Sequence, residues 1–199
     1  MLKRVFDVVV AAAGLVILSP LLAVIAIAIK LDSRGSVLYR GVRVGLNGQR
    51  FRMLKFRTMI TNAEALGTAT AQRDHRITRI GRFLRKYKLD ELPQLVNVVR
   101  GEMSLVGPRP EVEEHTSVYN DEEQIILTVR PGITDYSSIR FANLGDLLGG
   151  DDPETANRVF IEKYRAEKNR LRIDYVRNRS FFGDLGILFK TVARLVRRR

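Results

Sequence analysis

The sequence contains no cysteine, no tryptophan and only two histidines, His75 and His115, which are far apart. Without cysteine the chain forms neither disulfides nor thiolate metal sites. Two distant histidines argue against a zinc site, so any bound metal should be a hard cation with oxygen ligands. The absence of tryptophan, and of an aromatic stacking strip among the basic residues, counts against nucleic-acid binding.

Acidic residues are also scarce, since 22 Asp and Glu face 34 Lys and Arg and give a net charge of +12. Such a charge indicates an anionic partner: nucleic acid, acidic lipid headgroups or phosphorylated substrates. The 199 residues suffice for one domain with a core, and the chain contains no repeat and no Gly/Ser linker. We therefore expect an apolar segment at residues 1–32 and a single domain at residues 33–199.

The apolar segment, Val5–Ile29, has Asp7 as its only charged residue and is long enough to cross a bilayer as a helix. Asp7 can pair with Lys3 and Arg4, one turn earlier. Ser19-Pro20 lies in the middle, where a proline kinks or breaks a helix. Two interpretations stay open: a spanning helix with a tolerated proline, or a helix that breaks and returns to the same face. Basic residues at both ends favour the second.

Residues 36–59 have the pattern of a β-hairpin. Strand-like segments at residues 37–39 and 51–56 flank Asn47-Gly48, which is a strong turn signal. Side chains alternate along a strand, so Lys55 and Arg57 share one face. That face is either a sheet edge protected by charge or a pair of cations directed at a diphosphate.

Two further segments have the pattern of basic amphipathic helices. Residues 74–88 place apolar side chains on one face: Ile77, Ile80, Phe83, Leu84 and Tyr87. From residue 181 onward the apolar positions are Leu185, Leu188, Phe189, Val192, Leu195 and Val196. Such helices suit an anionic membrane surface. A packed terminal helix with a solvated tail is the alternative for the second segment.

Asp90 and Glu91 are adjacent carboxylates in this basic chain, within the stretch Leu89–Gln94. Pro93 fits the first turn of a helix, apolar residues continue at helical spacing, and Gly101 ends the pattern. Acidic residues at such a position have two explanations, because they either cap free N–H groups or perform chemistry. Basic residues on both sides and a rigid turn downstream favour chemistry.

Two rigid turns follow the carboxylates. After a short buried strand expected at residues 103–106, Gly107-Pro108-Arg109-Pro110 restricts the backbone and holds Arg109 in place. A fixed guanidinium suits bidentate phosphate binding, and a salt bridge to Asp90 or Glu91 is its structural alternative. Arg130–Thr134 is the second rigid turn. Three glutamates between the turns balance the basic surface and receive no chemistry: Glu111, Glu113 and Glu114.

Four motifs occur in order along the chain: Lys55–Met59, Leu89–Gln94, Ser104–Pro110 and Arg130–Thr134. With them the chain resembles the bacterial sugar transferase family, specifically the small monotopic phosphoglycosyl transferases. The resemblance covers nearly the whole chain. It implies an α+β fold with a small hairpin, several interfacial amphipathic helices and a re-entrant membrane helix broken at Ser19-Pro20. It also implies a monotopic enzyme on the cytoplasmic face of the bacterial inner membrane.

The resemblance implies that a sugar-1-phosphate passes from a UDP-sugar to polyprenyl (undecaprenyl) phosphate and that UMP is released. This would be the first membrane step of glycoconjugate biosynthesis, such as that of an exopolysaccharide, with membrane lipids and downstream glycosyltransferases as further partners. Carried over residue by residue, it makes Asp90 the nucleophile and a contact of Mg²⁺ or Mn²⁺, with Glu91 assisting in proton handling or metal placement. The expected substrate contacts are Lys55, Arg57, Gln94, Pro108, Arg109, Pro110, Arg130 and Thr134.

One segment departs from the pattern of the family. After the Arg130–Thr134 motif many members continue with Gly-Leu-Ala-Gln and then Asn-Gly-Arg, whereas this chain has Asp135–Ala142. Ala142 stands near the place of the expected arginine, and Arg140 is a candidate replacement. The sequence therefore does not name the sugar.

Charge and basic helices alone allow two other classes of function. One is a membrane-anchored nucleic-acid-binding protein and the other a nonenzymatic membrane scaffold. Because the chain contains no recognised reader motif, we expect no nucleic acid among its partners. Release of UMP from UDP-sugars, with Mg²⁺ and polyprenyl phosphate present, separates all three functions.

Overall fold

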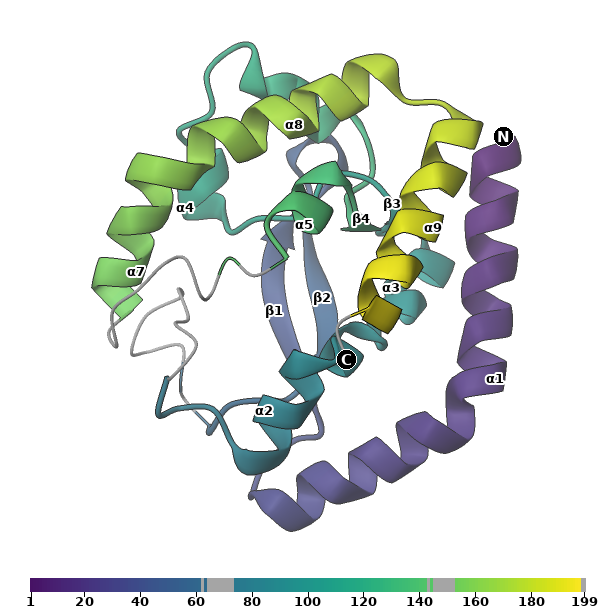
Figure 1. Cartoon of the computed structure of the whole chain (residues 1–199), viewed down its shortest axis with the longest axis vertical. Helices are drawn as coiled ribbons and strands as arrows, with labels where there is room; N and C mark the ends of the chain where they lie inside the picture. Colours follow the sequence, from purple (N-terminus) through teal and green to yellow (C-terminus); the bar gives the residue numbers. More distant parts are fainter. Residues whose placement is uncertain (62, 64–73, 143, 145–152, 198–199) are drawn as a thin grey trace.

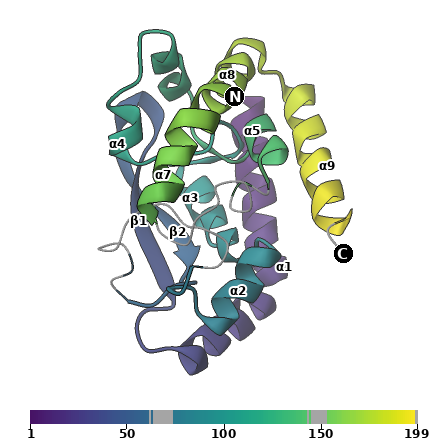
Figure 2. The same cartoon turned by 60° about the vertical axis from the view of Figure 1, so that its left-hand side comes forward.

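The structure is a computed structural model that describes residues 1–61, 63, 74–142, 144 and 153–197. A central hairpin of β1 (Leu38–Val44) and β2 (Arg50–Phe56) is surrounded by helices, and the long α1 (Leu2–Asp32) runs along one side (Figure 1). α8 (Arg165–Asn178) crosses near one end of the hairpin and α2 (Arg79–Lys86) lies near the other (Figures 1 and 2). This mixture of helices and small sheets confirms the α+β expectation.

α1 is a single helix of 31 residues that includes Pro20. Its axis changes direction midway (Figure 1), as expected for a proline inside a helix. Pro20 has no N–H to donate to the carbonyl of Val16, and the hydroxyl of Ser19 donates to that carbonyl instead, at 2.8 Å. The expected break is therefore a bend in a continuous helix. That both ends of α1 lie on one membrane face stays a prediction.

Most of the surface of α1 is apolar and exposed. By length and composition the helix could cross a membrane, and large side chains such as Val16, Ile17 and Val24 are more than half exposed. A narrow stripe packs on the domain, where Ala11 joins the main core and Ile29 joins a second cluster. The helix is thus suited to lipid on one side and bound to the domain on the other.

Charged side chains near the start of α1 tie it to the domain. Arg4 donates to two carbonyls at the end of α3 (Gln94–Arg100), that of Val98 at 2.7 Å. Asp7 is buried, accepts a 2.7 Å hydrogen bond from Ser104 Oγ and lies 3.8 Å from Lys3 Nζ. The expected pairing of Asp7 with Lys3 is confirmed. The pairing with Arg4 is wrong, because the free carbonyls at the end of α3 bind that guanidinium.

The predicted hairpin forms, although its first strand is longer than expected. β1 and β2 pair antiparallel along their whole length, and the turn η1 (Leu46–Gly48) connects them. Asn47 and Gly48 have φ angles of 54° and 74°, the left-handed conformation that these two residue types adopt most readily.

The two rigid turns meet in a second sheet. β3 (Ser104–Val106) is the expected buried strand, and it pairs in parallel with β4 (Gly132–Thr134). A Cβ atom on Gly132 would lie 2.1 Å from the backbone nitrogen of Gly107. The two backbones therefore approach so closely that only glycine fits. This contact holds the turn that carries Arg109 beside the Arg130–Thr134 turn.

α2 is shorter than the amphipathic helix predicted from residue 74. It begins after Thr78, whose side chain accepts from the N–H of Gly81 at 3.0 Å. Before it, Arg76 is 1% exposed and is paired with Asp74 at 2.5 Å, so this arginine belongs to no basic surface. The amphipathic character persists in α2 itself, where Leu84 is buried and Arg79, Arg82 and Lys86 are exposed. Phe83, expected on the apolar face, is also exposed.

The remaining elements enclose the other sides of the hairpin. They are η3 (Leu89–Glu91), α4 (Glu113–Thr116), η4 (Glu123–Thr128), α5 (Tyr136–Arg140), α7 (Pro153–Val159), η5 (Phe160–Tyr164) and α9 (Phe181–Arg197). The side chain of Glu111, just before α4, is 8% exposed and lies 2.6 Å from the buried Arg172 of α8. Glu111 therefore pairs with an interior arginine, and the expectation that it balances the basic surface is wrong.

α9 packs beside the N-terminal half of α1. The rings of Phe6 and Phe181 meet edge to face at 5.4 Å, and Lys3 Nζ lies 2.6 Å from Asp184. Phe189 and Val192, both on the expected apolar face, are exposed, while the side chains of residues 195 and 196 lie outside the described part.

Candidate active site

Asp90 and Glu91 lie in the short turn η3, between α2 and α3. Lys88 before them has a left-handed backbone, with φ 57°, which turns the chain sharply. α3 then starts after Pro93 and ends at Gly101, as predicted, and no side chain of the described residues caps its first N–H groups. The capping explanation for the two carboxylates is therefore not found.

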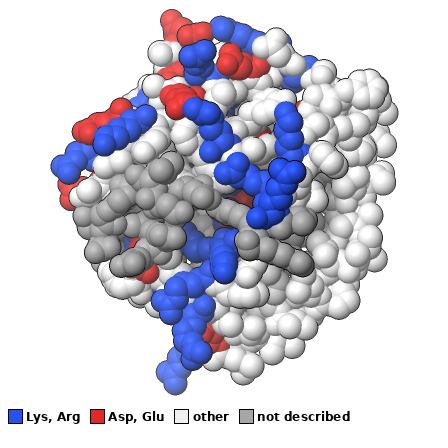
Figure 3. Space-filling model, viewed as in Figure 1, with Lys and Arg blue, Asp and Glu red and all other residues white. Residues whose placement is uncertain are grey.

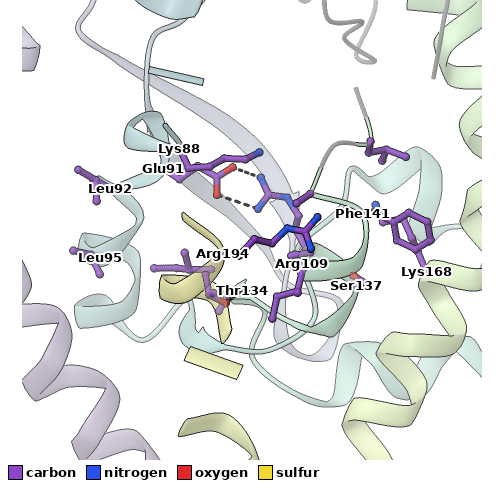
Figure 4. A pocket seen from close by; sticks show the side chains of 16 residues that line it. Lys88, Glu91, Leu92, Leu95, Arg109, Thr134, Ser137, Phe141, Lys168 and Arg194 are labelled. Atoms are coloured by element: carbon purple, nitrogen blue, oxygen red, sulfur yellow. Dashed lines mark hydrogen bonds and ion pairs between the residues drawn. The ribbon is translucent and has the colours of Figure 1, made fainter. Parts of the chain in front are cut away.

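Glu91 is held between two cations. Nη1 of Arg109 donates to Oε2 at 3.2 Å and Nη2 donates to Oε1 (Figure 4). Lys55 Nζ lies 3.3 Å from Oε1. Burial alone would raise the pKa of Glu91, but Arg109 and Lys55 outweigh burial and hold this pKa well below its usual range. Glu91 is therefore ionised, and the salt-bridge alternative for Arg109 is confirmed.

Asp90 has a different environment from its neighbour. It is 6% exposed, and its Oδ1 has no hydrogen-bond partner among the described residues. Burial and the negative charge of Glu91 raise the pKa of Asp90. Gln94, one turn later, is fully buried, and the described chain offers no partner to either atom of its amide. Because unpaired buried polar atoms are costly, they mark a place where a ligand, ion or water completes the bonding.

Three cavities surround this group of residues. The large cavity, about 870 Å³, is lined by Asp90, Lys55, Arg57 and Arg85. The α9 cavity, about 380 Å³, lies between α3, β4, α5 and α9 and is lined by Glu91, Arg109 and Thr134 (Figure 4). The α8 cavity, about 230 Å³, is lined by Lys55, Arg109 and Pro110 on one side and by α8 on another. The Lys55–Glu91–Arg109 group is thus shared among all three.

Two predicted substrate contacts have other partners in the structure. Arg57 lines the large cavity, yet its guanidinium donates to the carbonyls of Ser33 and Arg34 at the end of α1, both at 2.7 Å. Arg130 donates from Nε to the carbonyl of Gly101 at 2.9 Å, and it lines none of the three cavities. Their roles in substrate binding stay predictions.

The other predicted contacts gather around Arg109. The carbonyl of Pro108 accepts from the N–H of Gly132 at 2.9 Å, so the second rigid turn fixes the first. Pro110 lines the α8 cavity, while Thr134 lines the α9 cavity and shares a 2.8 Å hydrogen bond with Thr191 of α9. Whether each contacts substrate stays a prediction.

Sequence reasoning missed several basic residues at these cavities. Arg85 shares the large cavity with Asp90, and its place on α2, five residues before Asp90, was the available signal. Lys168 and Arg194 come from helices far along the chain and carry no local motif. Arg140, the candidate replacement for the arginine of the family, instead pairs on the surface with Glu167 at 2.6 Å.

The carboxylates suit a magnesium ion only in combination with substrate. In the part of the chain that the structure describes, no three acidic or histidine side chains form a metal cluster. The unpartnered Oδ1 of Asp90 fits as one ligand, since Mg²⁺ commonly takes one or two carboxylates together with substrate phosphates. Both oxygens of Glu91 are engaged by cations.

The charges on the surface are distributed unevenly between the centre of this face and the side formed by α1. Figure 3 shows lysine and arginine side chains gathered over the middle of this face, whereas the side formed by α1 is almost free of charge. A basic centre attracts phosphorylated substrates, and an uncharged flank suits lipid.

Residues 1–198 match the family model described as bacterial sugar transferase. The chain belongs to this family. The exopolysaccharide production protein ExoY of Rhizobium meliloti (strain 1021) is 39% identical over 208 residues, covering 96% of this chain and 84% of the relative. The UDP-glucose:undecaprenyl-phosphate glucose-1-phosphate transferase of Caulobacter vibrioides is 42% identical over 198 residues, covering 98% and 69%. The Escherichia coli (strain K12) protein of the same name is 38% identical over 196 residues, covering 96% and 39%.

Membership confirms the family recognised from the four motifs and identifies the chain as a sugar transferase enzyme. Neither the family nor these relatives support a nucleic-acid-binding protein or a scaffold. Together with the apolar α1, they indicate an enzyme associated with a membrane.

Proposed function

We propose that this sugar transferase moves a sugar-1-phosphate from a UDP-sugar to polyprenyl phosphate and releases UMP. One observation carries the proposal: Asp90 is a buried carboxylate with an unpartnered oxygen at the wall of a basic cavity. The names of the relatives from Caulobacter and Escherichia, which state UDP-glucose and undecaprenyl phosphate, support this class of donor and acceptor.

In the first half-reaction an oxygen of Asp90 attacks the phosphorus that carries the sugar. A bond forms between this oxygen and phosphorus, and the bond from phosphorus to the bridging oxygen breaks, so UMP leaves with that oxygen. Lys55 and Arg85 line the same cavity and offset the repulsion between carboxylate and diphosphate. Covalent catalysis divides one difficult displacement into two easier ones.

In the second half-reaction an oxygen of the acceptor phosphate attacks the same phosphorus, and the Asp90 oxygen leaves as a carboxylate. Because each displacement runs in line, the acceptor phosphate approaches from the side that UMP has left. Glu91, the next residue in the chain, is the candidate to orient the acceptor phosphate or to take its proton. A bound Mg²⁺ or Mn²⁺, held by Asp90 and substrate oxygens, would neutralise phosphate charge.

The acceptor explains the membrane anchor. The phosphate of a polyprenyl lipid stays at the headgroup layer, so the site must lie at that depth. We therefore propose a monotopic enzyme on the cytoplasmic face of the bacterial inner membrane, where UDP-sugars are available. The product, a lipid-linked sugar, would pass to downstream glycosyltransferases that extend it, as in exopolysaccharide synthesis.

UMP release tests the proposal. Purified protein is incubated with Mg²⁺ and a panel of UDP-sugars that includes UDP-glucose and UDP-galactose, with and without undecaprenyl phosphate. We expect continuous UMP release only when the acceptor is present, and at most one UMP per enzyme without it. If no UDP-sugar of a broad panel gives acceptor-dependent UMP, the proposed reaction is wrong.

A further inference from the structure

The α8 cavity holds more positive charge than the reaction described above requires. Its basic lining residues are Arg43, Lys55, Arg109, Lys168 and Arg172. The carboxylate that faces them is Glu111, with His115 lying 3.7 Å from it. Such an excess of cations around about 230 Å³ favours an anionic occupant.

Arg172 is 1% exposed, and only part of its guanidinium is paired. Nη1 donates to Glu111 at 2.6 Å and to Asn169 Oδ1 at 3.0 Å. Nε and Nη2 have no acceptor anywhere in the described part of the chain. These two N–H groups form the edge that binds two oxygens of a phosphate or carboxylate together. Buried donors without partners are costly, so this edge indicates an oxyanion.

Lys168 lies one turn before Arg172 on the same face of α8. It is 8% exposed and lines both the α8 cavity and the α9 cavity. Its Nζ lies 4.8 Å from the ring centre of Phe160, and no carboxylate of the described residues forms a salt bridge with it. Burial, followed by the charge of Arg172, lowers the pKa of Lys168 to about 8. A bound anion would reverse that effect.

We propose that Lys168 and Arg172 bind a phosphate of the donor, in the UMP half of the UDP-sugar. The identity of the ligand rests on the proposed function. Lys55 and Arg109 line the same cavity and hold Glu91, so a phosphate bound here would share these two cations with Glu91.

The position of the α8 cavity distinguishes the donor from the lipid acceptor. Its lining includes His115 of α4 and Asn157 of α7, and these helices lie across the hairpin from α1 (Figure 1). A lipid phosphate would stay near the apolar surface of α1, whereas a water-soluble nucleotide reaches the opposite side freely. The site therefore suits the nucleotide.

The test measures UMP binding by calorimetry on the full chain in detergent, together with KM for donor and acceptor. Lys168→Met and Arg172→Gln should each weaken UMP binding, and raise KM for the UDP-sugar, about tenfold, as loss of a charge-assisted hydrogen bond does. KM for polyprenyl phosphate should not change. Lys168→Arg keeps the charge and should recover most of the affinity. Arg170→Gln, on the exposed face of α8, is the matched control.

Lys168→Met keeps the test decisive if Arg172→Gln fails to fold, because Arg172 also anchors Glu111. UMP affinity equal to that of the Arg170→Gln control in the folded variants would overturn the inference and leave the cavity to water. A change confined to KM for polyprenyl phosphate would overturn it too, in favour of the lipid phosphate. Wild-type protein that binds UMP, loses it in these variants and yet transfers no sugar-phosphate would support the site and refute the proposed function.

Discussion

Asp90 and Glu91 are consecutive residues whose carboxylates line different cavities. They lie in a 3-10 turn, where successive side chains diverge by about a third of a turn. One carboxylate keeps an unpartnered oxygen while the other is ion-paired on both oxygens. Their pKa values move in opposite directions, up for Asp90 and down for Glu91. Neighbouring carboxylates with opposite shifts are suited to different chemical roles.

Asp90→Asn should abolish both UMP release and the covalent intermediate, because the amide has nearly the same shape but is not a nucleophile. Intact-protein mass spectrometry after mixing with UDP-sugar, without acceptor, should show a sugar-phosphate adduct in wild type only. Asp121→Asn, at an exposed position, is the control and should retain the adduct. Full turnover by folded Asp90→Asn would exclude Asp90 as the nucleophile.

The activity should fall on the acid side as Asp90 becomes protonated. Since burial and Glu91 raise the pKa of Asp90, the fall should begin at a higher pH than for an ordinary aspartate. Glu91→Gln removes the negative charge and leaves Lys55 and Arg109 unneutralised, and both changes lower the pKa of Asp90.

The acid limb of UMP release in a single turnover should therefore shift to lower pH in Glu91→Gln, whatever its absolute rate. Glu113→Gln, which alters an exposed carboxylate paired with Arg50, should leave the limb in place. An acid limb that stays at the same pH or shifts to higher pH in Glu91→Gln would contradict the coupling between the two carboxylates.

Short-range patterns predicted much of the fold. Asn47-Gly48 located the hairpin turn and Gly101 the end of α3, because asparagine and glycine adopt the left-handed conformation readily. Pro93 located the start of α3, because proline restricts its own backbone. The rigid turn around Arg109 was also predicted, since prolines act locally. The elements that carry Asp90, Glu91 and Arg109 were therefore accessible from the sequence.

Contacts between residues far apart in the chain could not be predicted from the sequence. Arg4 reaches carbonyls more than ninety residues away rather than its helical neighbour, and Arg57 binds the end of α1. Lys168 and Arg172 line the same cavity as Arg109 only because α8 crosses near one end of the hairpin. Such contacts depend on how the elements pack, and no local spacing reports them.

Chelation should stop turnover. Asp90 is the candidate ligand, and Mg²⁺ held by few carboxylates and substrate oxygens exchanges readily with EDTA. UMP release should disappear after chelation and return with added Mg²⁺ or Mn²⁺. The control is the melting temperature, which should not change, since the ion is not expected to hold the fold. Undiminished UMP release after thorough chelation would contradict the metal requirement.

Asp7→Ala should destabilise the contact between α1 and β3. The change removes the acceptor of the buried N–H of Leu105 and leaves the Ser104 hydroxyl with the carbonyl of Val106 alone, and an unsatisfied buried group costs about 1–3 kcal/mol. Unfolding of the detergent-solubilised protein in denaturant should show a lower midpoint. Asp7→Asn, whose amide oxygen still accepts, should lose less. Asp174→Ala, an exposed aspartate on α8, is the control, and a midpoint equal to it would refute the role of Asp7.

The bend at Pro20 should set the topology of α1. The hydroxyl of Ser19 satisfies the carbonyl that Pro20 releases, so both residues stabilise the bend. Pro20→Leu with Ser19→Ala should straighten the helix, because the missing hydrogen bond and ring clash of a proline cost about 3 kcal/mol in a helix interior. A straight helix of 31 residues is long enough to cross the bilayer and would carry its N-terminus to the outside.

Leu2→Cys reports the outcome, since the chain has no native cysteine to interfere. In intact cells a membrane-impermeant thiol reagent should leave this cysteine unlabelled while Pro20 and Ser19 are present. It should label the cysteine, at least in part, in the straightened variant. Permeabilised cells, in which both proteins should be labelled, control for reactivity. Strong labelling of intact cells with Pro20 and Ser19 in place would show that α1 spans the membrane, and the re-entrant topology would then be wrong.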